Sequence, residues 1–325
     1  MEQLPFVVAD IGGTNARFGL VTARDATTGQ FDIEQIHVLP CAEFATFEAV
    51  LGAYIERVSG DRPHAACIAI AGPVTGDRIK MTNLSWEFSV ETVRKQFQLS
   101  NLEVINDFGA QAYATLYMAD ADLPVVKEGD SLPTSPRAIL GPGTGLGVAG
   151  LINQAGRWYP LCGEGGHITY APTSDIEVAI REVIEPSGKH VSVEKFVSGP
   201  GLKNIYTALA AVKDQAVDDI SPGQISALAM SQESALAVEA LNLFFKILGS
   251  AAADVTLVMG AWGGVYLGGG ILPKVESQFH QGPFIDSFVA KGRMGAILEK
   301  VPVRLMKGDK PALAGAAHWL YDSRN

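Results

Sequence analysis

Two stretches of this 325-residue chain combine glycine, threonine and polar groups in a way suited to phosphate binding. The first is Asp10-Ile-Gly-Gly-Thr14, which follows the apolar residues 6–9 and leads into the apolar residues 18–21. Glycines let a phosphate approach backbone N–H groups because no Cβ blocks them. An acid at a strand end can hold a divalent cation or its water shell. The same pattern also fits an ordinary hairpin turn.

The same pattern of a strand, a Gly-Thr turn and another strand is expected again over residues 137–152, with the turn at Gly143-Thr144-Gly145. Neither turn leads into a helix, which argues against a dinucleotide-binding βαβ unit. Neither ends in the Gly-Lys-Ser/Thr of a P-loop. The repetition suggests two related lobes that close on one nucleotide. A third cluster, Gly268-Gly269-Gly270, removes side chains where a flat ring could enter, although a close helix–strand contact would need the same glycines.

Asn106-Asp107 is expected at a junction between a strand and a helix. A carboxylate held there could accept a proton from a substrate hydroxyl, and phosphoryl transfer tolerates a weak base because positioning dominates it. The plain alternative is that Asp107 is a helix N-cap.

Glu164 and His167 lie three residues apart in a glycine-rich turn. Carboxylate and imidazole together suit the binding of vicinal hydroxyls. The spacing also suits a metal pair, but no third-ligand motif accompanies it. Glu194, taken alone, reads as part of a solvated helix face. No nucleophile motif of the Gly-x-Ser-x-Gly type is present.

The elements that must position these groups alternate between strand and helix patterns. Strands are expected at 5–10, 16–23, 32–39, 66–71 and 102–107, helices at 44–58 and 108–118, and a loop at 120–137. Residues 265–273 predict a strand, a turn and a helix. Residues 236–259 are apolar at helical spacing but are interrupted by charges, which favours a buried helix over a membrane span.

The composition indicates a well-cored protein, with 47% apolar residues and a formal net charge of −10. That charge disfavours nucleic acid and anionic membranes as partners. The first residues lack the basic and apolar regions of a secretory leader. Cys41, Cys67 and Cys162 lie far apart in the sequence, so no disulfide framework is expected, which suits a reducing cytoplasm.

Taken in order, these motifs resemble the bacterial ATP-dependent glucokinases, a non-zinc group within the hexokinase–actin superfamily. The resemblance spans nearly the whole chain. The matching blocks are residues 10–17, 67–73, 81–86, 105–108, 141–147, 163–167, 191–194, 198–201 and 268–271. The related sugar kinases that bind structural zinc carry a cysteine-rich motif after their histidine. This chain has Ile168-Thr-Tyr-Ala-Pro there, so the resemblance implies no zinc.

The resemblance implies an α/β fold with two lobes of actin-like ATPase (ribonuclease H-like) type and a central cleft. The smaller lobe would comprise residues 1–112 plus 305–325, including a C-terminal helix from about 305, and the larger lobe residues 113–304. Asp107 would be the general base on the sugar's 6-hydroxyl. The other hydroxyls would be bound by Asn106, Glu164, His167 and Glu194.

The resemblance also implies the nucleotide contacts, and Asp10 would face Mg²⁺ through water. The ATP-binding residues would be Ala9, Asp10, Ile11, Gly12, Gly13, Thr14, Gly143, Thr144, Gly145, Gly268, Gly269 and Gly270.

The implied activity is ATP-dependent phosphorylation of D-glucose to glucose 6-phosphate and ADP, at the start of glycolysis, by a cytoplasmic homodimer. Two alternatives stay open: a kinase for another hexose or N-acyl-hexosamine, and a non-catalytic regulator that binds sugar and ATP. Related regulators carry an added DNA-binding segment, and this chain starts its first expected strand too early to hold one.

Overall fold

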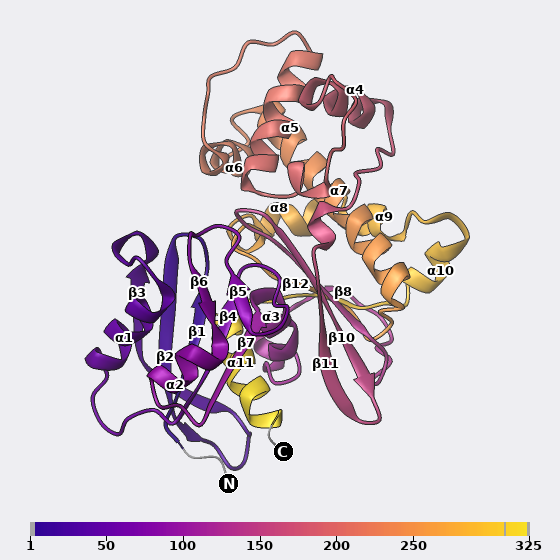
Figure 1. Ribbon diagram of the computed structural model, residues 1–325. Coiled ribbons are helices and arrows are strands. Elements are labelled where there is room, and N and C mark those ends of the chain that lie inside the picture. Colours follow the sequence, from indigo (N-terminus) through magenta and orange to yellow (C-terminus); the bar gives the residue numbers. More distant parts are fainter. Residues whose placement is uncertain (1–3, 309, 324–325) are drawn as a thin grey trace. The chain divides into compact units, whose positions relative to one another are not determined.

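The computed structural model describes residues 4–308 and 310–323 (Figure 1). The described residues form two compact units. The first unit contains the residues up to Ala119, with Arg157–Cys162 and the residues from Gly308 onward. The second contains Asp120–Gly156 and Gly163–Lys307. The lobe boundaries expected at 112 and 305 stay a prediction, and residues 1–3, used to exclude a leader, lie outside the described residues.

The first unit is built on a five-stranded sheet with the order β3-β2-β1-β4-β7 (Figure 1). β1 pairs antiparallel with β2 and parallel with β4, and β4 pairs parallel with β7. The strands are β1 (Phe6–Ile11), β2 (Asn15–Arg24), β3 (Phe31–Pro40), β4 (Ala65–Ile70) and β7 (Asn101–Asn106). A separate hairpin joins β5 (Arg78–Lys80) to β6 (Glu87–Ser89).

Helices cover both faces of this sheet, so β1 is apolar on both sides. Val7 and Ala9 belong to one core cluster, whereas Phe6 and Val8 belong to the cluster on the opposite face. Asp10 is the first polar residue of the strand. The helices of the unit are α1 (Phe47–Arg57), α2 (Val90–Gln96), α3 (Asp107–Ala114) and α11 (Pro311–Asp322), with a 3₁₀ turn η1 (Cys41–Glu43).

The sheet of the second unit runs in the order β10-β9-β12-β13-β8. β9 pairs antiparallel with β10 and parallel with β12. The strands are β8 (Val125–Lys127), β9 (Arg137–Pro142), β10 (Leu146–Gln154), β12 (Val265–Leu267) and β13 (Val303–Leu305). β11 (Arg157–Gly163) is divided between the two units after Cys162.

The long helix α7 (Ala235–Met259) forms the centre of the second unit's core. By length and composition it could cross a membrane, but 61% of its most apolar window is buried inside the protein, which confirms the expected buried helix. The other helices are α4 (Asp175–Ile184), α5 (Gly199–Val212), α6 (Pro222–Met230), α8 (Glu276–Gln281), α9 (Phe284–Val289) and α10 (Gly295–Leu298). Short 3₁₀ turns are η2 (Asp120–Asp122), η3 (Gly165–His167), η4 (Val193–Lys195), η5 (Leu272–Lys274) and η6 (Gly292–Met294).

Four expectations about the elements are wrong. The helix expected over residues 108–118 ends at Ala114, because the Thr115 N–H turns back to the carbonyls of Ala112 and Tyr113. The helix expected from residue 44 begins at Phe47, because the Thr46 hydroxyl accepts the Ala49 N–H at 3.2 Å and caps it. The loop expected at 120–137 contains the strand β8, which pairs with β13. The C-terminal helix expected from about 305 begins at Pro311, since residues 303–305 pair with β12 as strand β13.

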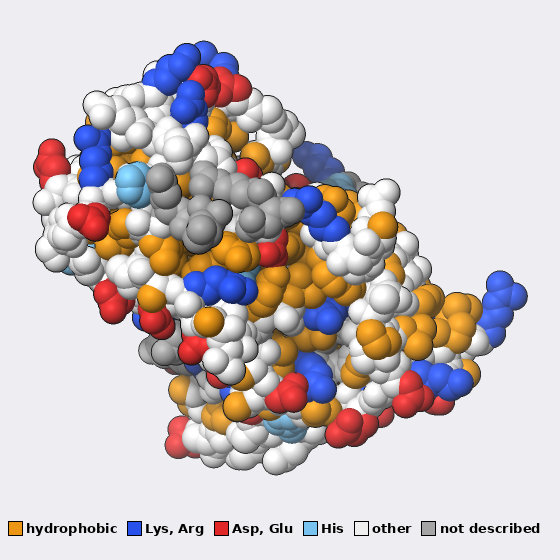
Figure 2. Space-filling view, turned by 90° about the horizontal axis from the view of Figure 1, so that it is seen from below, with side chains coloured by type: hydrophobic (Ala, Val, Ile, Leu, Met, Phe, Trp, Pro, Cys, Tyr) orange, Lys and Arg blue, Asp and Glu red, His pale blue; other side chains and the backbone are white. Residues whose placement is uncertain are grey.

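Side chains of both charges, Lys and Arg as well as Asp and Glu, lie on the face that Figure 2 shows. Exposed ion pairs such as Arg78–Glu87 and Lys95–Glu91 join some of the protein's surface charges. Each such pair contributes little to stability, about 0–1 kcal/mol, because water screens it.

Candidate active site

The turn between β1 and β2 places Gly12, Gly13 and Thr14 at one end of the first unit's sheet. The Gly12 N–H donates to the Asn15 carbonyl at 3.1 Å, and the Cys41 N–H donates to the Thr14 carbonyl at 2.8 Å. These two bonds fix both ends of the turn. The strand, glycine turn and strand expected from the sequence are confirmed. Only backbone atoms of the neighbouring Ala9 and Ile11 could reach a ligand, because their side chains are buried.

Asp10 lies near the end of β1, in register with Arg17 on β2. The guanidinium Nη1 of Arg17 is 4.0 Å from Asp10 Oδ2. Burial raises the pKa of Asp10, and the charge of Arg17 opposes this shift. Within residues 4–308 and 310–323, no group of three or more His, Cys, Asp or Glu side chains is placed to hold a metal ion. Asp10 alone therefore supplies one carboxylate beside the turn, and a divalent cation there would need most of its oxygen ligands from another source.

Asn106 and Asp107 mark the passage from β7 into α3. Asn106, not Asp107, is the N-cap: its Oδ1 accepts the Gly109 N–H at 3.0 Å. Its Nδ2 donates to the Gly72 carbonyl at 3.1 Å. Asp107 is the first helical residue, and its Oδ1 accepts the Phe108 N–H at 2.9 Å. The alternative reading of Asp107 as a plain N-cap is therefore wrong.

The turn Gly143-Thr144-Gly145 in the second unit lies against the start of a helix. The Gly143 N–H donates to the Gly145 carbonyl at 2.8 Å, and the Gly199 N–H donates to the Gly143 carbonyl at 2.8 Å. Gly199 is the first residue of the 14-residue helix α5, which Ser198 caps through the Gly201 N–H. This turn thus lies beside the N-terminus of α5, and helix N-termini favour anions.

Glu194 binds the backbone beside this turn. Its Oε2 accepts the Leu146 N–H at 2.8 Å. A Cβ built on Gly145 would lie 2.5 Å from the same oxygen, so a larger residue at this position would displace the Glu194 carboxylate. The interpretation of Glu194 alone as part of a solvated helix face is wrong, since its carboxylate is engaged at the start of β10.

The turn that carries Glu164 and His167 packs on the same strand. Glu164 forms an isolated bridge with Val148 of β10. A Cβ on Gly166 would lie 2.1 Å from the Leu146 carbonyl oxygen, which shows how closely the turn approaches. Both His167 and Glu164 are exposed. Three of the five expected sugar-binding residues, Glu164, His167 and Glu194, thus gather around residues 146–148, whereas Asn106 and Asp107 belong to the first unit.

Gly268, Gly269 and Gly270 follow β12 and lie beside the end of β9. The Gly268 N–H donates to the Leu140 carbonyl at 2.8 Å. Gly269 has φ +82°, and a Cβ there would lie 2.4 Å from the Pro142 carbonyl oxygen. The close approach is therefore between this turn and strand β9, not between a helix and a strand as the alternative had it.

A largely apolar cavity of about 460 Å³ opens next to Gly270. Its lining residues are Gly199, Leu202, Pro222, Gly223, Ser226, Ala227, Met230, Gly270, Ile271 and Lys274. A cavity of this size and polarity suits a flat aromatic base. The cluster thus contacts β9 through Gly269 and borders a cavity through Gly270, and its role in nucleotide binding stays a prediction.

Sequence reasoning missed the part of this cavity that α6 contributes. The local signal was available, because Ser221 and Gln224 form a capping box and Pro222 occupies the first turn of the helix. That signal predicts where a helix begins. It does not predict that the helix packs beside a glycine cluster almost fifty residues later in the chain.

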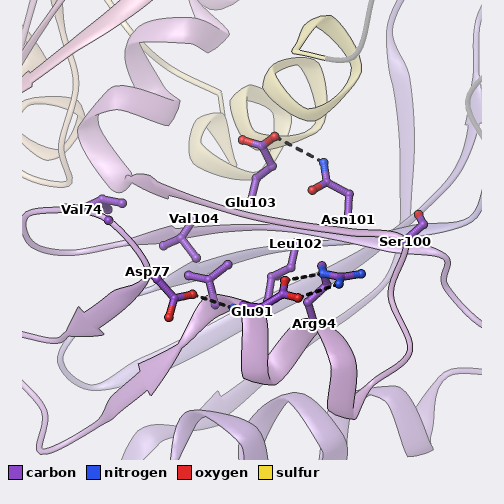
Figure 3. A pocket seen from close by; sticks show the side chains of 11 residues that line it. Val74, Asp77, Glu91, Arg94, Ser100, Asn101, Leu102, Glu103 and Val104 are labelled. Carbon is purple, nitrogen blue, oxygen red and sulfur yellow. Dashed lines mark hydrogen bonds and ion pairs between the residues drawn. The ribbon is translucent and has the colours of Figure 1, made fainter.

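A second cavity, of about 440 Å³, lies in the first unit along β7 and α2 (Figure 3). Its charged groups already have hydrogen-bond partners: Arg94 donates to Glu91, and the Asp77 carboxylate accepts the backbone N–H of Glu91 at 2.9 Å. Asn101 likewise donates to Glu103 at 3.3 Å. None of the expected site residues lines this cavity, so we place the candidate site elsewhere.

Comparisons of its sequence and of its structure with known proteins both match the chain to glucokinases. A sequence model of the glucokinase family matches residues 7–323. The chain is 42% identical to a glucokinase of Saccharophagus degradans, over 98% of this chain and 99% of that one. It is similar to the crystal structure of a glucokinase from an Antarctic psychrotroph, with a TM-score of 0.89, 40% identity and coverage of 99% and 100%.

A more distant structure shares the fold. The glucokinase of the ROK family from Streptomyces griseus, solved in complex with glucose and AMPPNP, has a TM-score of 0.64 at 21% identity. It covers 97% of this chain and 98% of its own.

Proposed function

Because the chain belongs to the glucokinase family, we propose that it transfers the terminal phosphoryl group of ATP to the 6-hydroxyl of D-glucose. The products are glucose 6-phosphate and ADP. The observation that carries this proposal is the grouping of Glu164, His167 and Glu194 around the strand that follows a Gly-Thr-Gly phosphate turn.

We assign ATP binding to the backbone of both glycine turns and to the apolar cavity beside Gly270. Residues 9–14 and 143–145 offer N–H groups that suit phosphate oxygens. The start of α5, which is bonded to Gly143, adds the positive end of a helix dipole. The adenine ring would fit the cavity lined by α6 and residues 270–274.

Asp107 is the proposed general base. Asp107 is the first residue of α3 and directly follows the last residue of β7. Its Oδ1 already accepts the Phe108 N–H. In the proposed step its carboxylate accepts the proton of the sugar's 6-hydroxyl while that oxygen bonds to phosphorus and the bond to ADP breaks. Phosphoryl transfer has a loose transition state, so exact placement of this base matters more than its basicity.

Asn106, Glu164, His167 and Glu194 are the proposed partners of the remaining hydroxyls. Carboxylates accept hydrogen bonds from hydroxyls, and an imidazole can donate or accept. A site built from such groups rejects a sugar that lacks a hydroxyl more strongly than one with added bulk, because a buried partner would stay unpaired.

We also propose a magnesium ion that the phosphates of ATP coordinate and that Asp10 contacts through water. Such an ion would neutralise charge on the transferred phosphoryl group. Asp10 and its neighbour Arg17 supply one negative and one positive charge beside the Gly12-Gly13 turn.

Glucose phosphorylation by this chain would begin glycolysis, and we place the protein in the cytoplasm as a homodimer. The sparse cysteines support a reducing compartment, and the family's activity supports the place in glycolysis. Sedimentation velocity of the purified chain tests the dimer, and a single species of monomer mass at micromolar concentration would contradict it.

A panel of acceptors tests the proposed reaction. ADP release, coupled to a reporter enzyme, is measured with ATP and Mg²⁺ and with glucose, mannose, fructose or N-acetylglucosamine. We expect glucose to give the highest kcat/KM. A higher kcat/KM for another sugar would support the kinase for a different hexose or N-acyl-hexosamine. Binding of glucose and ATP without any ADP release would support the non-catalytic regulator.

A further inference from the structure

The loop from Met81 to Trp86 matches the family but has no role in the reaction as proposed above. The Met81 N–H donates to the Trp86 carbonyl at 3.1 Å, and both side chains are buried in the first unit's core. The Trp86 Nε1 also donates to the Phe44 carbonyl at 3.1 Å. Both ends of the loop are therefore anchored, whereas Thr82 and Asn83 at its tip are exposed.

Asn83 lies directly against the phosphate turn. A Cβ added to Gly13 would lie 2.9 Å from Asn83 Cβ and 3.7 Å from its Cγ. The nearest atom is the Cβ, which is bonded to the backbone and cannot rotate away as the end of a long side chain could. The position of the Gly13 backbone is thus limited by Asn83.

Thr82, the preceding residue, lies against a second glycine at the sugar side of the unit. A Cβ on Gly72 would lie 2.6 Å from Thr82 Oγ1, and Gly72 has φ +133°. The Gly72 carbonyl accepts the Nδ2 of Asn106, whose Oδ1 caps α3 next to Asp107. One anchored loop therefore contacts both the phosphate turn and the backbone that holds Asn106.

We infer that Thr82 and Asn83 are positioning residues that set the spacing between the Gly12-Gly13 phosphate turn and the strand end that carries Asn106 and Asp107. Asn83 acts through Gly13, and Thr82 acts through Gly72 and Asn106. The inference rests on the proposed function for the roles of the turn and of Asp107. The contacts lie within one compact unit.

A paired substitution tests the Asn83 contact. Gly13→Ala alone should raise the KM for ATP and the Kd for AMPPNP about tenfold or more, because overpacking against Asn83 displaces the turn. Gly13→Ala with Asn83→Gly should restore both constants to within about threefold of the wild type, since the opposing Cβ is gone. Gly13→Ala with Asn83→Ala is the matched control and should not be restored, because the Cβ at 83 remains.

Comparing the constants for ATP and AMPPNP with the KM for glucose and the thermal midpoint distinguishes a displaced phosphate turn from a general loss of structure. The KM for glucose and the thermal midpoint of unfolding should change little in the Gly13 and Asn83 variants. If both double variants behave like Gly13→Ala, the methyl group acts on the phosphate itself and the role of Asn83 is wrong. If Asn83→Gly and Asn83→Ala restore binding equally, the contact is not the cause and the inference also fails.

Thr82→Ala tests the other contact. Removing the group that covers Gly72 should raise the KM for glucose severalfold and leave the Kd for AMPPNP unchanged. Thr82→Ser keeps the hydroxyl and should restore the KM for glucose. An unchanged KM for glucose in Thr82→Ala would overturn the role of Thr82. Calorimetric binding of AMPPNP needs no turnover, so the Asn83 test can succeed or fail independently of the proposed reaction.

Discussion

At the scale of single residues, His167 has an exposed side chain and a backbone that hydrogen bonds hold on both sides. Its N–H donates to the Glu164 carbonyl at 3.0 Å, and its own carbonyl lies 3.1 Å from the Nε2 of His190. A histidine that only filled the core would be buried, and this one is not. An exposed imidazole whose backbone is held by two hydrogen bonds suits a polar ligand.

Replacing His167 with Ala should raise the KM for glucose about tenfold or more and change the KM for ATP little. The reason is the loss of one hydrogen bond to a sugar hydroxyl, which is worth about 1–3 kcal/mol when its partner stays buried. Initial rates with varied glucose measure this. His64→Ala, an exposed histidine in the first unit, is the control and should behave like the wild type. Equal KM values for glucose in the two variants would return His167 to a purely structural role.

The sequence predicted some of these residues better than others. Asp107 and Asn106 were found because a strand pattern ends in two polar residues before a helix pattern, although which of them caps the helix depends on the backbone angles at the junction. Glu194 could not be placed from its own surroundings in sequence. Its carboxylate is bound by the Leu146 N–H, 48 residues earlier, and only the fold brings the two together.

At the scale of elements, the docking of α11 on the first unit's sheet buries a histidine. His318 is 2% exposed, and its ring stacks on Tyr117 with centroids 3.5 Å apart. In the part of the chain that the structure describes, its buried Nε2 makes no hydrogen bond. Burial lowers the pKa of His318 to about 4; Asp322 opposes this shift, and Arg24 adds to it.

This low pKa predicts a loss of stability in mild acid. An unfolded histidine takes up a proton near pH 6.5, but the folded one does so only near pH 4, so protons favour the unfolded chain across this interval. By about pH 5 the free energy of unfolding should fall by about 2 kcal/mol on this account. Urea unfolding of the wild type and of His318→Phe, near pH 7.5 and near pH 5, measures the effect.

The phenylalanine variant should lose less stability than the wild type between the two pH values, because its ring cannot be protonated. An identical loss in both proteins would show that His318 does not cause it.

The pKa of Glu177 is also perturbed, but it affects stability in a different pH range. Burial alone would raise that pKa, but hydrogen bonds from Lys246, Tyr170 and Thr173 outweigh it and lower the pKa to about 2. The contribution of the Glu177 carboxylate to the free energy of unfolding is therefore lost only below about pH 4.5.

Elements were predicted well where the hydrophobic pattern is regular. β1 and the β9–β10 hairpin follow their apolar runs closely, because both faces of these strands are covered. Short elements were predicted poorly. β8 has three residues and pairs with β13. The C-terminal helix was expected from about residue 305, where β13 ends after its pairing with β12. In such strands the partner decides the structure more than the local sequence does.

At the scale of the whole molecule, glucose should stabilise the folded chain. A ligand that binds only the folded state adds about 2.7 kcal/mol at one hundred times its Kd. Thermal unfolding followed with and without glucose should therefore show a rise of the midpoint that grows with the logarithm of concentration. The glucose epimer galactose is the control, and an equal rise with both sugars would contradict a selective hexose site.

The repeated Gly-Thr turn predicted the broad organisation of the chain. Each of the two compact units contains one such turn at the end of a mixed sheet. The lobe boundaries expected at 112 and 305 stay a prediction. Arg157–Cys162 belongs to the first unit although the chain on either side belongs to the second. Neither composition nor charge distinguishes such a short segment from the residues on either side of it.

The most direct test of the account is a single-turnover experiment with Asp107→Ala, glucose and ATP labelled in its terminal phosphate. We expect almost no labelled glucose 6-phosphate, while the Kd for AMPPNP stays close to that of the wild type, because the variant loses only the base that receives the 6-hydroxyl proton. A rate of transfer within tenfold of the wild type would contradict the role of Asp107 and with it the proposed mechanism.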